Sequence, residues 1–157
     1  MTKDYIKDLE LIGLTARIRR LNDKLMSSGK KVYKIFNIDI EPNWHLVLLL
    51  LEEKENLTVT EIASILDFSH PAVIKITKKM IEKKYLVSTK DKIDNRKQIL
   101  SLTSKANLEL PKLKEKWELI RQVHAEYTSE SFMQELAQLE KKLNDKSIEQ
   151  RILKKLQ

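Results

Sequence analysis

The stretch "TVTEIASILDFSHPAVIKITKKMIEKKY", residues Thr58–Tyr85, decides the fold. In its first part Thr60 can cap a short helix whose apolar side chains recur at helical spacing and which ends near Asp67. In its second part Ser69 can cap a longer helix, and Pro71 lies in the first turn, where a missing N–H costs nothing. Two short helices separated by about three residues are typical of a helix-turn-helix, in which the first helix supports the second against a DNA groove.

Beyond Tyr85 the hydrophobic period changes. Apolar residues 86–87 and 99–102 form two short runs on either side of a polar, charged segment. This pattern predicts a two-stranded hairpin with a long tip over residues 90–97. Thr103 or Ser104 then caps a helix that continues to Tyr127, and Pro111 is expected to kink or break it.

Longer amphipathic patterns surround this region. The pattern of residues 3–28 predicts one helix, which the sequence "SSG" ends. Residues 43–56 are expected to form a deeply buried helix, and residues 129–157 one final helix. We therefore expect a mainly α fold, with a three-helix core and a β-hairpin wing forming a winged helix-turn-helix over residues 41–103. The whole chain, residues 1–157, is expected to be a single domain.

The terminal segments, residues 1–40 and 104–157, are more amphipathic than one winged domain requires. Their apolar stripes bury best against a symmetry mate, which predicts a twofold homodimer with recognition helices about 34 Å apart. The residues expected at the dimer interface are Ile6, Leu9, Leu136, Leu139, Leu143, Ile152 and Leu156.

Composition narrows the class of protein. The chain has a net charge of +7. It contains no cysteine, and this absence excludes disulfides, thiolate zinc sites and thiol switches. Residues 58–105 hold ten Lys and Arg against five Asp and Glu, and so carry most of that charge. A nucleic-acid partner and a solvated lysine surface are both compatible with this distribution. Neither a signal peptide nor a membrane span is predicted, and we expect a cytoplasmic protein without membrane contact.

The segment "IDNRKQILSLTSKA", residues 93–106, resembles the wing signature of the MarR family of transcriptional regulators. In that signature Asp, any residue and Arg precede a strand that ends in Leu-Thr. Asp94, Arg96, Leu102 and Thr103 match it.

Two further segments carry the resemblance, which extends from about residue 12 to residue 140. Residues 69–87 are similar to the family's recognition helix and the strand after it, and residues 41–51 to the helix upstream. Lys84 and Ala106 stand where the family usually has glycine. The resemblance implies a ligand-responsive, homodimeric repressor of transcription that binds a pseudo-palindromic operator in double-stranded DNA.

The expected DNA contacts follow from the faces of the recognition helix. Val73, Ile76, Thr77 and Met80 share one face and should pack on the core. On the other face, Lys75 and Lys78 can contact phosphate or guanine. Ile74 is expected to be exposed there, and it either contacts a thymine methyl or is an ordinary surface residue. The residues expected to bind DNA are Ser69, His70, Pro71, Ile74, Lys75, Lys78, Lys79, Arg96 and Lys97.

Within the wing, the guanidinium of Arg96 suits the narrow, electronegative minor groove. Asp94 is unsuited to phosphate, but its carboxylate can pair with Arg96 or with backbone N–H groups and so shape the tip. The alternative is an exposed hairpin with an incidental ion pair.

By analogy with the family, aromatic residues near the second helix are expected to line a crevice for a small aromatic or phenolic effector. These residues are Tyr33, Phe36, Trp44 and His45, and for each of them packing in the core or dimer joint is the competing interpretation.

Catalysis and metal binding are not expected. The three histidines fall in separate elements without metal-ligand spacing, and the two glycines form no phosphate-binding loop. We therefore predict no catalytic residues, no metal and no cofactor. The main alternative to a DNA-binding regulator is a winged-helix scaffold for protein interactions with only non-specific affinity for DNA.

Overall fold

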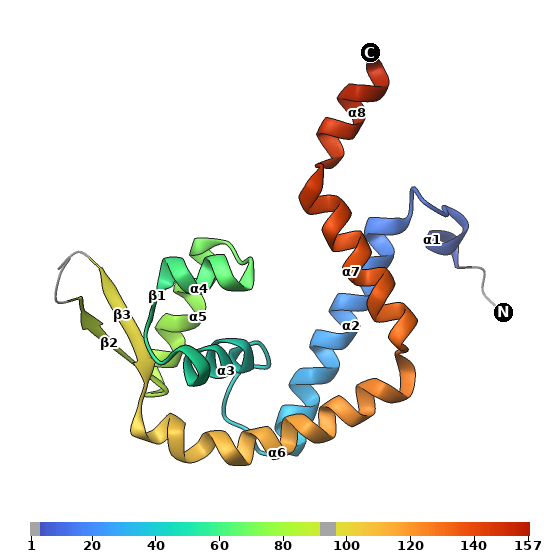
Figure 1. Cartoon of the computed structure of the whole chain (residues 1–157). Coiled ribbons are helices and arrows are strands. Elements are labelled where there is room, and N and C mark those ends of the chain that lie inside the picture. The colour runs from blue at the N-terminus through green and yellow to red at the C-terminus, as the bar shows by residue number, and fades with distance from the viewer. Residues whose placement is uncertain (1–3, 92–96) are drawn as a thin grey trace. The chain divides into compact units, whose positions relative to one another are not determined.

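Helices α3, α4 and α5 and a three-stranded antiparallel sheet form a winged helix-turn-helix in the computed structural model (Figure 1), which describes residues 4–91 and 97–157. The elements in chain order are α1 (Tyr5–Asp8), α2 (Leu14–Ile35), α3 (Trp44–Lys54), β1 (Leu57–Thr58), α4 (Val59–Leu66), α5 (His70–Glu82), β2 (Leu86–Lys90), β3 (Gln98–Leu102), α6 (Ser104–Tyr127), α7 (Glu130–Asp145) and α8 (Ile148–Leu156). The chain divides into two compact units, Met1–Leu113 and Lys114–Gln157, which are described separately. The predicted mainly α winged helix is confirmed.

A capping box starts α4. The hydroxyl of Thr58 accepts from the N–H of Glu61 at 3.2 Å, and the Glu61 carboxylate accepts from the N–H of Thr58 at 2.7 Å. These two bonds satisfy donors that a helix start leaves unpaired. The prediction that Thr60 caps this helix is wrong, because the extended backbone that a cap requires occurs at Thr58, two residues earlier.

Residues 67–69 form the predicted turn between α4 and α5. Asp67 ends α4 in the left-handed conformation, with φ of 52° and its N–H donating to the carbonyl of Ala63. Aspartate tolerates this conformation better than most residues because its short side chain can bond locally. Ser69 then adopts the extended N-cap conformation, and Pro71 lies in the first turn of α5, as predicted.

The hairpin β2–β3 has the predicted position, and the strand order is β1-β3-β2. Its register pairs Leu86 with Leu102 at one end and Lys90 with Gln98 at the other. A third strand, β1, was not predicted; its two residues pair with Ile99 and Leu100 of β3. Two residues are too few to produce a period in the sequence.

The core of the winged helix lies between α3, α5, the sheet and the first turns of α6. Helix α3 contributes the most. The buried run predicted here is confirmed for Val47, Leu48, Leu50 and Leu51, whereas Leu46 is half-buried and Leu49 is 37% exposed. Side chains with at most 2% exposure are Trp44, Val47, Leu48, Leu51, Ile62, Val73, Met80, Tyr85, Leu86, Leu100, Ala106 and Leu110.

The N-terminal segment is interrupted where one helix was predicted. The chain leaves helical geometry between Asp8 and Leu14, and Glu10 has φ of 48°. The chain becomes helical again after Gly13. Glycine is required at this position because a Cβ would lie 2.4 Å from the carbonyl oxygen of Ile6. Helix α2 then passes through Gly29 to Ile35, so the prediction that "SSG" ends the helix is wrong.

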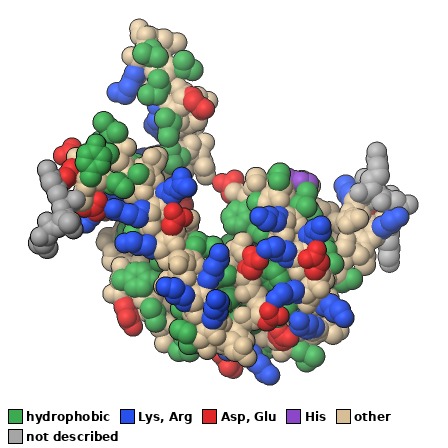
Figure 2. Space-filling model, turned by 180° about the vertical axis from the view of Figure 1, so that it is seen from behind, with side chains coloured by type: hydrophobic (Ala, Val, Ile, Leu, Met, Phe, Trp, Pro, Cys, Tyr) green, Lys and Arg blue, Asp and Glu red, His purple; other side chains and the backbone are tan. Residues whose placement is uncertain are grey.

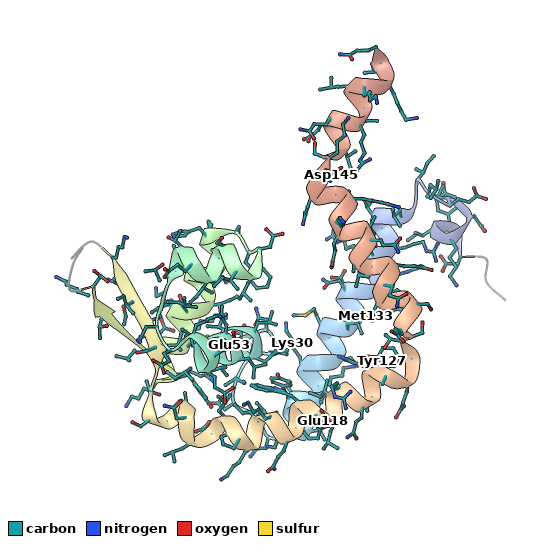
Figure 3. All side chains as sticks on the ribbon, in the orientation of Figure 1. Lys30, Glu53, Glu118, Tyr127, Met133 and Asp145 are labelled. Carbon is teal, nitrogen blue, oxygen red and sulfur yellow. The ribbon has the colours of Figure 1, made fainter. Side chains whose placement is uncertain are left out.

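The C-terminal helices also differ from the prediction. Helix α6 continues through Pro111 without a break. The single helix expected over residues 129–157 is two helices, because Lys146 is extended and Ser147 starts α8 with its own capping box to Gln150. Asp145, labelled in Figure 3, is the last residue of α7. Among the described residues, no helix is long and apolar enough to span a bilayer.

Candidate nucleic-acid interface

Helix α5 has one buried face and one exposed face, which is the arrangement a recognition helix needs. Val73, Ile76, Thr77 and Met80 are buried, as predicted. The Thr77 hydroxyl donates to the carbonyl of Val73 at 2.9 Å, so this buried polar group is hydrogen-bonded. On the other face Ile74 is 46% exposed, and Lys75 and Lys78 are exposed. Within the described part of the chain, neither lysine has an ion-pair partner.

The start of α5 presents Ser69, His70 and Pro71 to solvent. Ser69 occupies the N-cap, but its hydroxyl makes no capping hydrogen bond. His70 Nε2 lies 3.4 Å from the Thr60 hydroxyl, a contact between the two helices that sequence reasoning missed. The exposed hydroxyl of Ser69 and the exposed ring of His70 at this helix start are suited to a phosphate.

Lys79 differs from the other lysines of α5. Its Nζ lies 2.5 Å from Glu41 Oε1 in the segment between α2 and α3. One turn further on, Lys83 pairs with the carboxylate of Asp39 and donates to its carbonyl at 3.2 Å. The alternating carboxylates of "IDIEP" are visible in the sequence, but nothing there indicates partners about forty positions away.

The wing is described only in part. Lys97 is exposed, and its carbonyl accepts from the N–H of Asp91 at 3.0 Å, which extends the hairpin beyond β2 and β3. Arg96 and Asp94 lie outside the described residues. Over the face shown in Figure 2, basic side chains lie among acidic ones.

The residues expected to bind an effector differ in how deeply they are buried. Tyr33 and Trp44 are 5% and 1% exposed, and Phe36 and His45 are half-buried. The Tyr33 hydroxyl donates to the carbonyl of Pro42 at 3.4 Å, and His45 Nδ1 lies 2.5 Å from the same oxygen. Since a carbonyl can only accept, Nδ1 carries a proton, and both residues fix the segment between α2 and α3.

Trp44 lines a pocket. Its Nε1 is buried without a hydrogen-bond partner among the described residues. The pocket has a volume of about 360 Å³, and its lining consists of Ile38, Asp39, Ile40, Glu41, Trp44, Lys79, Glu82 and Lys83. It is therefore a mixed apolar and charged space beside the two ion pairs.

The residues expected at a dimer interface lie on exposed apolar faces. On α7 and α8, Leu136 is 37%, Leu143 44%, Ile152 51% and Leu156 79% exposed. Ile6, Leu9 and Leu139 are half-buried. Hydrophobic side chains are visible along α8 in Figure 2, and Figure 3 labels Met133, another exposed residue of α7.

Helix α2 carries a similar apolar face. It lies within the N-terminal segment predicted to form the dimer, although its residues were not among the named interface candidates. Its exposed apolar residues recur at alternating four- and three-residue steps; they are Leu14, Ile18, Leu21 and Leu25. This 3.5-residue period is the pattern of helices that pack against other helices at a small angle.

No group of three His, Cys, Asp or Glu side chains among the described residues could hold a metal ion.

Comparisons with known proteins agree with this description. The model of the MarR family matches residues 38–97. The structure of overoxidized AbfR bound to DNA is 19% identical, with a TM-score of 0.71, and the match covers 88% of this chain and 96% of that one. BpsR of Bordetella bronchiseptica is 16% identical, with a TM-score of 0.71 and coverage of 94% and 100%.

A third structure, a mutant of MarR from E. coli complexed with operator DNA, is 16% identical, with a TM-score of 0.67 and coverage of 90% and 99%. No curated protein sequence matches the chain. The fold is thus a winged helix-turn-helix. More specifically, its winged region matches the model of the MarR family over residues 38–97, so the resemblance predicted from the sequence is confirmed.

Proposed function

We propose that this chain is a sequence-specific, double-stranded DNA-binding regulator of transcription that acts as a homodimer. The observation that supports this most is the exposed face of α5, which begins at Ser69 and His70 and continues through Ile74, Lys75 and Lys78. The first residues of a recognition helix contact base edges, while lysines contact phosphates or guanine. AbfR and the MarR mutant, which share this fold, are bound to DNA in their structures.

The dimer is supported by the exposed apolar faces of α2, α7 and α8. Each leucine or isoleucine removed from water contributes about 1.5–3 kcal/mol, so several such residues favour association with a second copy. A twofold dimer would place its two copies of α5 about one turn of DNA apart, ~34 Å, and would therefore bind a pseudo-palindromic operator.

We further propose that the protein is a repressor released by a small aromatic effector. BpsR, whose fold is similar, is regulated in its DNA binding by 6-hydroxynicotinic acid. In this chain the pocket beside Trp44 adjoins Lys79 of α5 and Lys83, the residue after this helix, so a ligand there would compete with their ion pairs.

Fluorescence anisotropy tests the DNA-binding proposal. The purified protein is titrated into the duplex from upstream of its own gene and into a scrambled duplex, each across a salt series. Lys75→Ala and Arg96→Ala should weaken binding to the upstream duplex about tenfold, while Lys112→Ala, an exposed lysine on α6, should leave it unchanged.

Sub-micromolar binding that prefers the upstream duplex would support the regulator, provided that this preference is lost in Lys75→Ala and Arg96→Ala but kept in Lys112→Ala. Equal and salt-fragile binding to both duplexes would instead favour the protein-interaction scaffold. In that case the apolar faces of α7 and α8 become the surfaces to study. A panel of aromatic acids, added to the bound complex, then tests for release.

A further inference from the structure

The end of α5 is joined to the start of α6 by a set of contacts that we call the α5–α6 joint, comprising Lys83–Tyr85 and Thr103–Glu109. On the α5 side the chain forms a Schellman turn. The N–H of Tyr85 donates to the carbonyl of Met80 at 2.8 Å, and the N–H of Lys84 donates to that of Ile81 at 2.9 Å. Lys84 has φ of 61°, the left-handed conformation that this turn requires.

Thr103 connects this turn to α6. Its hydroxyl accepts from the N–H of Ala106 at 3.2 Å, which caps α6, and donates to the carbonyl of Lys84 at 2.6 Å. The N–H of Thr103 donates to the carbonyl of Tyr85 at 3.1 Å. Lys105 Nζ donates to the carbonyl of Lys83 at 3.1 Å. Thus three successive carbonyls after the recognition helix are all bonded by residues at the start of α6.

The side chain of Tyr85 lies in the middle of the joint and is 2% exposed. The Tyr85 ring packs edge to face against Trp44 of α3, with 5.9 Å between the ring centroids. Nζ of Lys105, a residue of α6, lies 4.3 Å from the centroid of the Tyr85 ring. Its hydroxyl donates to Glu109 Oε2, two turns into α6. Burial, and next the Glu109 carboxylate, raise the pKa of Tyr85 well above its usual value, so the hydroxyl stays protonated and can donate at any physiological pH.

Helix α6 continues without interruption from this joint to Tyr127. We propose that the hydrogen bond between Tyr85 and Glu109 is a positioning contact for DNA recognition, which sets the orientation of α5 relative to the start of α6. Tyr85 and Glu109 do not themselves contact DNA. They act through the helix whose exposed face does, and the inference rests on the proposed function for its DNA readout.

The geometry explains why a hydroxyl matters here in addition to the packing of the ring. Thr103 and Lys105 bond the chain at the very start of α6. One turn further on, the Tyr85 ring alone would tolerate small rotations of α6, because apolar contacts have no direction. A hydrogen bond to a carboxylate fixes a distance and an angle, and it contributes more than a neutral hydrogen bond. Tyr85→Phe therefore removes the directional contact and leaves the ring between Trp44 and Lys105.

The test combines two measurements on the full chain. The first is the ratio of affinities for the upstream and scrambled duplexes, measured well below the unfolding temperature. The second is hydrogen exchange, followed residue by residue, without DNA. Tyr85→Phe should lower the affinity ratio about tenfold and accelerate exchange at Lys83–Tyr85 and in the first two turns of α6.

Three matched variants separate positioning from general loss of stability. Tyr127→Phe removes an exposed tyrosine hydroxyl from the far end of α6 and should change neither measurement. Glu109→Gln keeps an acceptor and should retain most of the ratio, whereas Glu109→Ala should match Tyr85→Phe. The double variant Tyr85→Phe/Glu109→Ala should be no worse than either single variant, since both remove the same bond.

An unchanged affinity ratio in Tyr85→Phe would overturn the proposal, as would equal losses for the two duplexes. If the wild-type chain binds no duplex with preference, the proposed function fails separately. In that case hydrogen exchange in Tyr85→Phe tests the joint. Accelerated exchange confined to the joint and α5 would support the positioning role, and an unchanged exchange pattern would overturn it.

Discussion

Nζ of Lys79 lies 2.5 Å from Oε1 of Glu41, so a lysine of α5 is paired with the segment that connects α2 to α3. Lys78, the preceding residue, is exposed and has no ion-pair partner among the described residues. Two adjacent lysines that look equivalent in the sequence therefore have different surroundings. A lysine already paired with a carboxylate releases fewer counterions when DNA binds.

Lys78→Ala should therefore weaken DNA binding more than Lys79→Ala. For Lys78→Ala the slope of log K against log salt should fall by about 0.9, the value for one phosphate contact. For Lys79→Ala the slope should change by less than half of that. Anisotropy titrations across a salt series measure both slopes, and equal reductions would show that Lys79 leaves Glu41 to contact DNA.

Lys84→Gly should stabilise the protein. Lys84 has φ of 61°, where a Cβ is unfavourable and glycine is not. We expect a gain of about 0.5–1 kcal/mol in the free energy of unfolding, measured by urea denaturation. Lys83→Gly, one residue earlier at φ of −85°, is the control and should be destabilising or neutral. A loss of stability in Lys84→Gly would mean that the lysine stem packs usefully on the turn.

The capping box of α4 should make stability depend on pH. The hydrogen bonds from the N–H and the hydroxyl of Thr58 lower the pKa of Glu61 below its usual 4.5. A carboxyl whose pKa is lower in the folded state stabilises the protein above pH 4.5, and this contribution is lost as the pH falls through the lowered pKa.

Glu61→Gln isolates that contribution, because glutamine can still accept from Thr58 but does not titrate. The difference in stability between wild type and Glu61→Gln should be constant above about pH 5 and shrink below pH 4.5, as followed by thermal unfolding. A constant difference down to about pH 3 would indicate that the carboxylate is not bonded to Thr58 in solution. Thr58→Ala should cost about 1 kcal/mol at neutral pH.

Alanine at the two glycines should have opposite effects. At Gly13 a Cβ would lie 2.4 Å from the Ile6 carbonyl oxygen, so Gly13→Ala must displace the segment that precedes α2. At Gly29 the nearest atoms to a Cβ are those of Pro42 at 3.7 Å, an ordinary contact. Gly29→Ala should raise the free energy of unfolding by up to about 1 kcal/mol, because alanine favours helix. Calorimetry of both variants checks the contrast.

Leu136→Glu should convert the proposed dimer to a monomer. Leu136 lies on the exposed apolar face of α7, and burying an unpaired carboxylate in an interface is strongly unfavourable. Gln138→Glu, which adds the same charge to the opposite side of α7, should leave the mass unchanged. Sedimentation equilibrium distinguishes the two masses, and a dimeric Leu136→Glu would place the interface elsewhere.

Local features of this fold were readable in the sequence alone. The helix-turn-helix follows from Asp67, Ser69 and Pro71, whose conformational preferences end one helix and start the next. The buried face of α5 follows from the helical spacing of its apolar residues. The hairpin follows from the change of period after Tyr85. Each of these signals acts over a few residues, which is the range in which side-chain and backbone preferences operate.

Other features depended on contacts that the pattern of single residues does not reveal. Periodicity over residues 3–28 gave no sign of the break before Gly13, where the carbonyl of Ile6 approaches closely. The pairing of Lys79 with Glu41, and of Tyr85 with Glu109, could not be foreseen, because neither residue of a pair carries a pattern that names its partner.

The sequence by itself thus determined which residues form α5 and which of them face the core, since both follow from local preference and periodicity. Only the tertiary structure decided which exposed lysines are already paired and which carbonyls the start of α6 bonds. Hydrogen bonds and ion pairs are directional and short in range, so they form between whichever groups the packing of distant segments brings within about 3 Å.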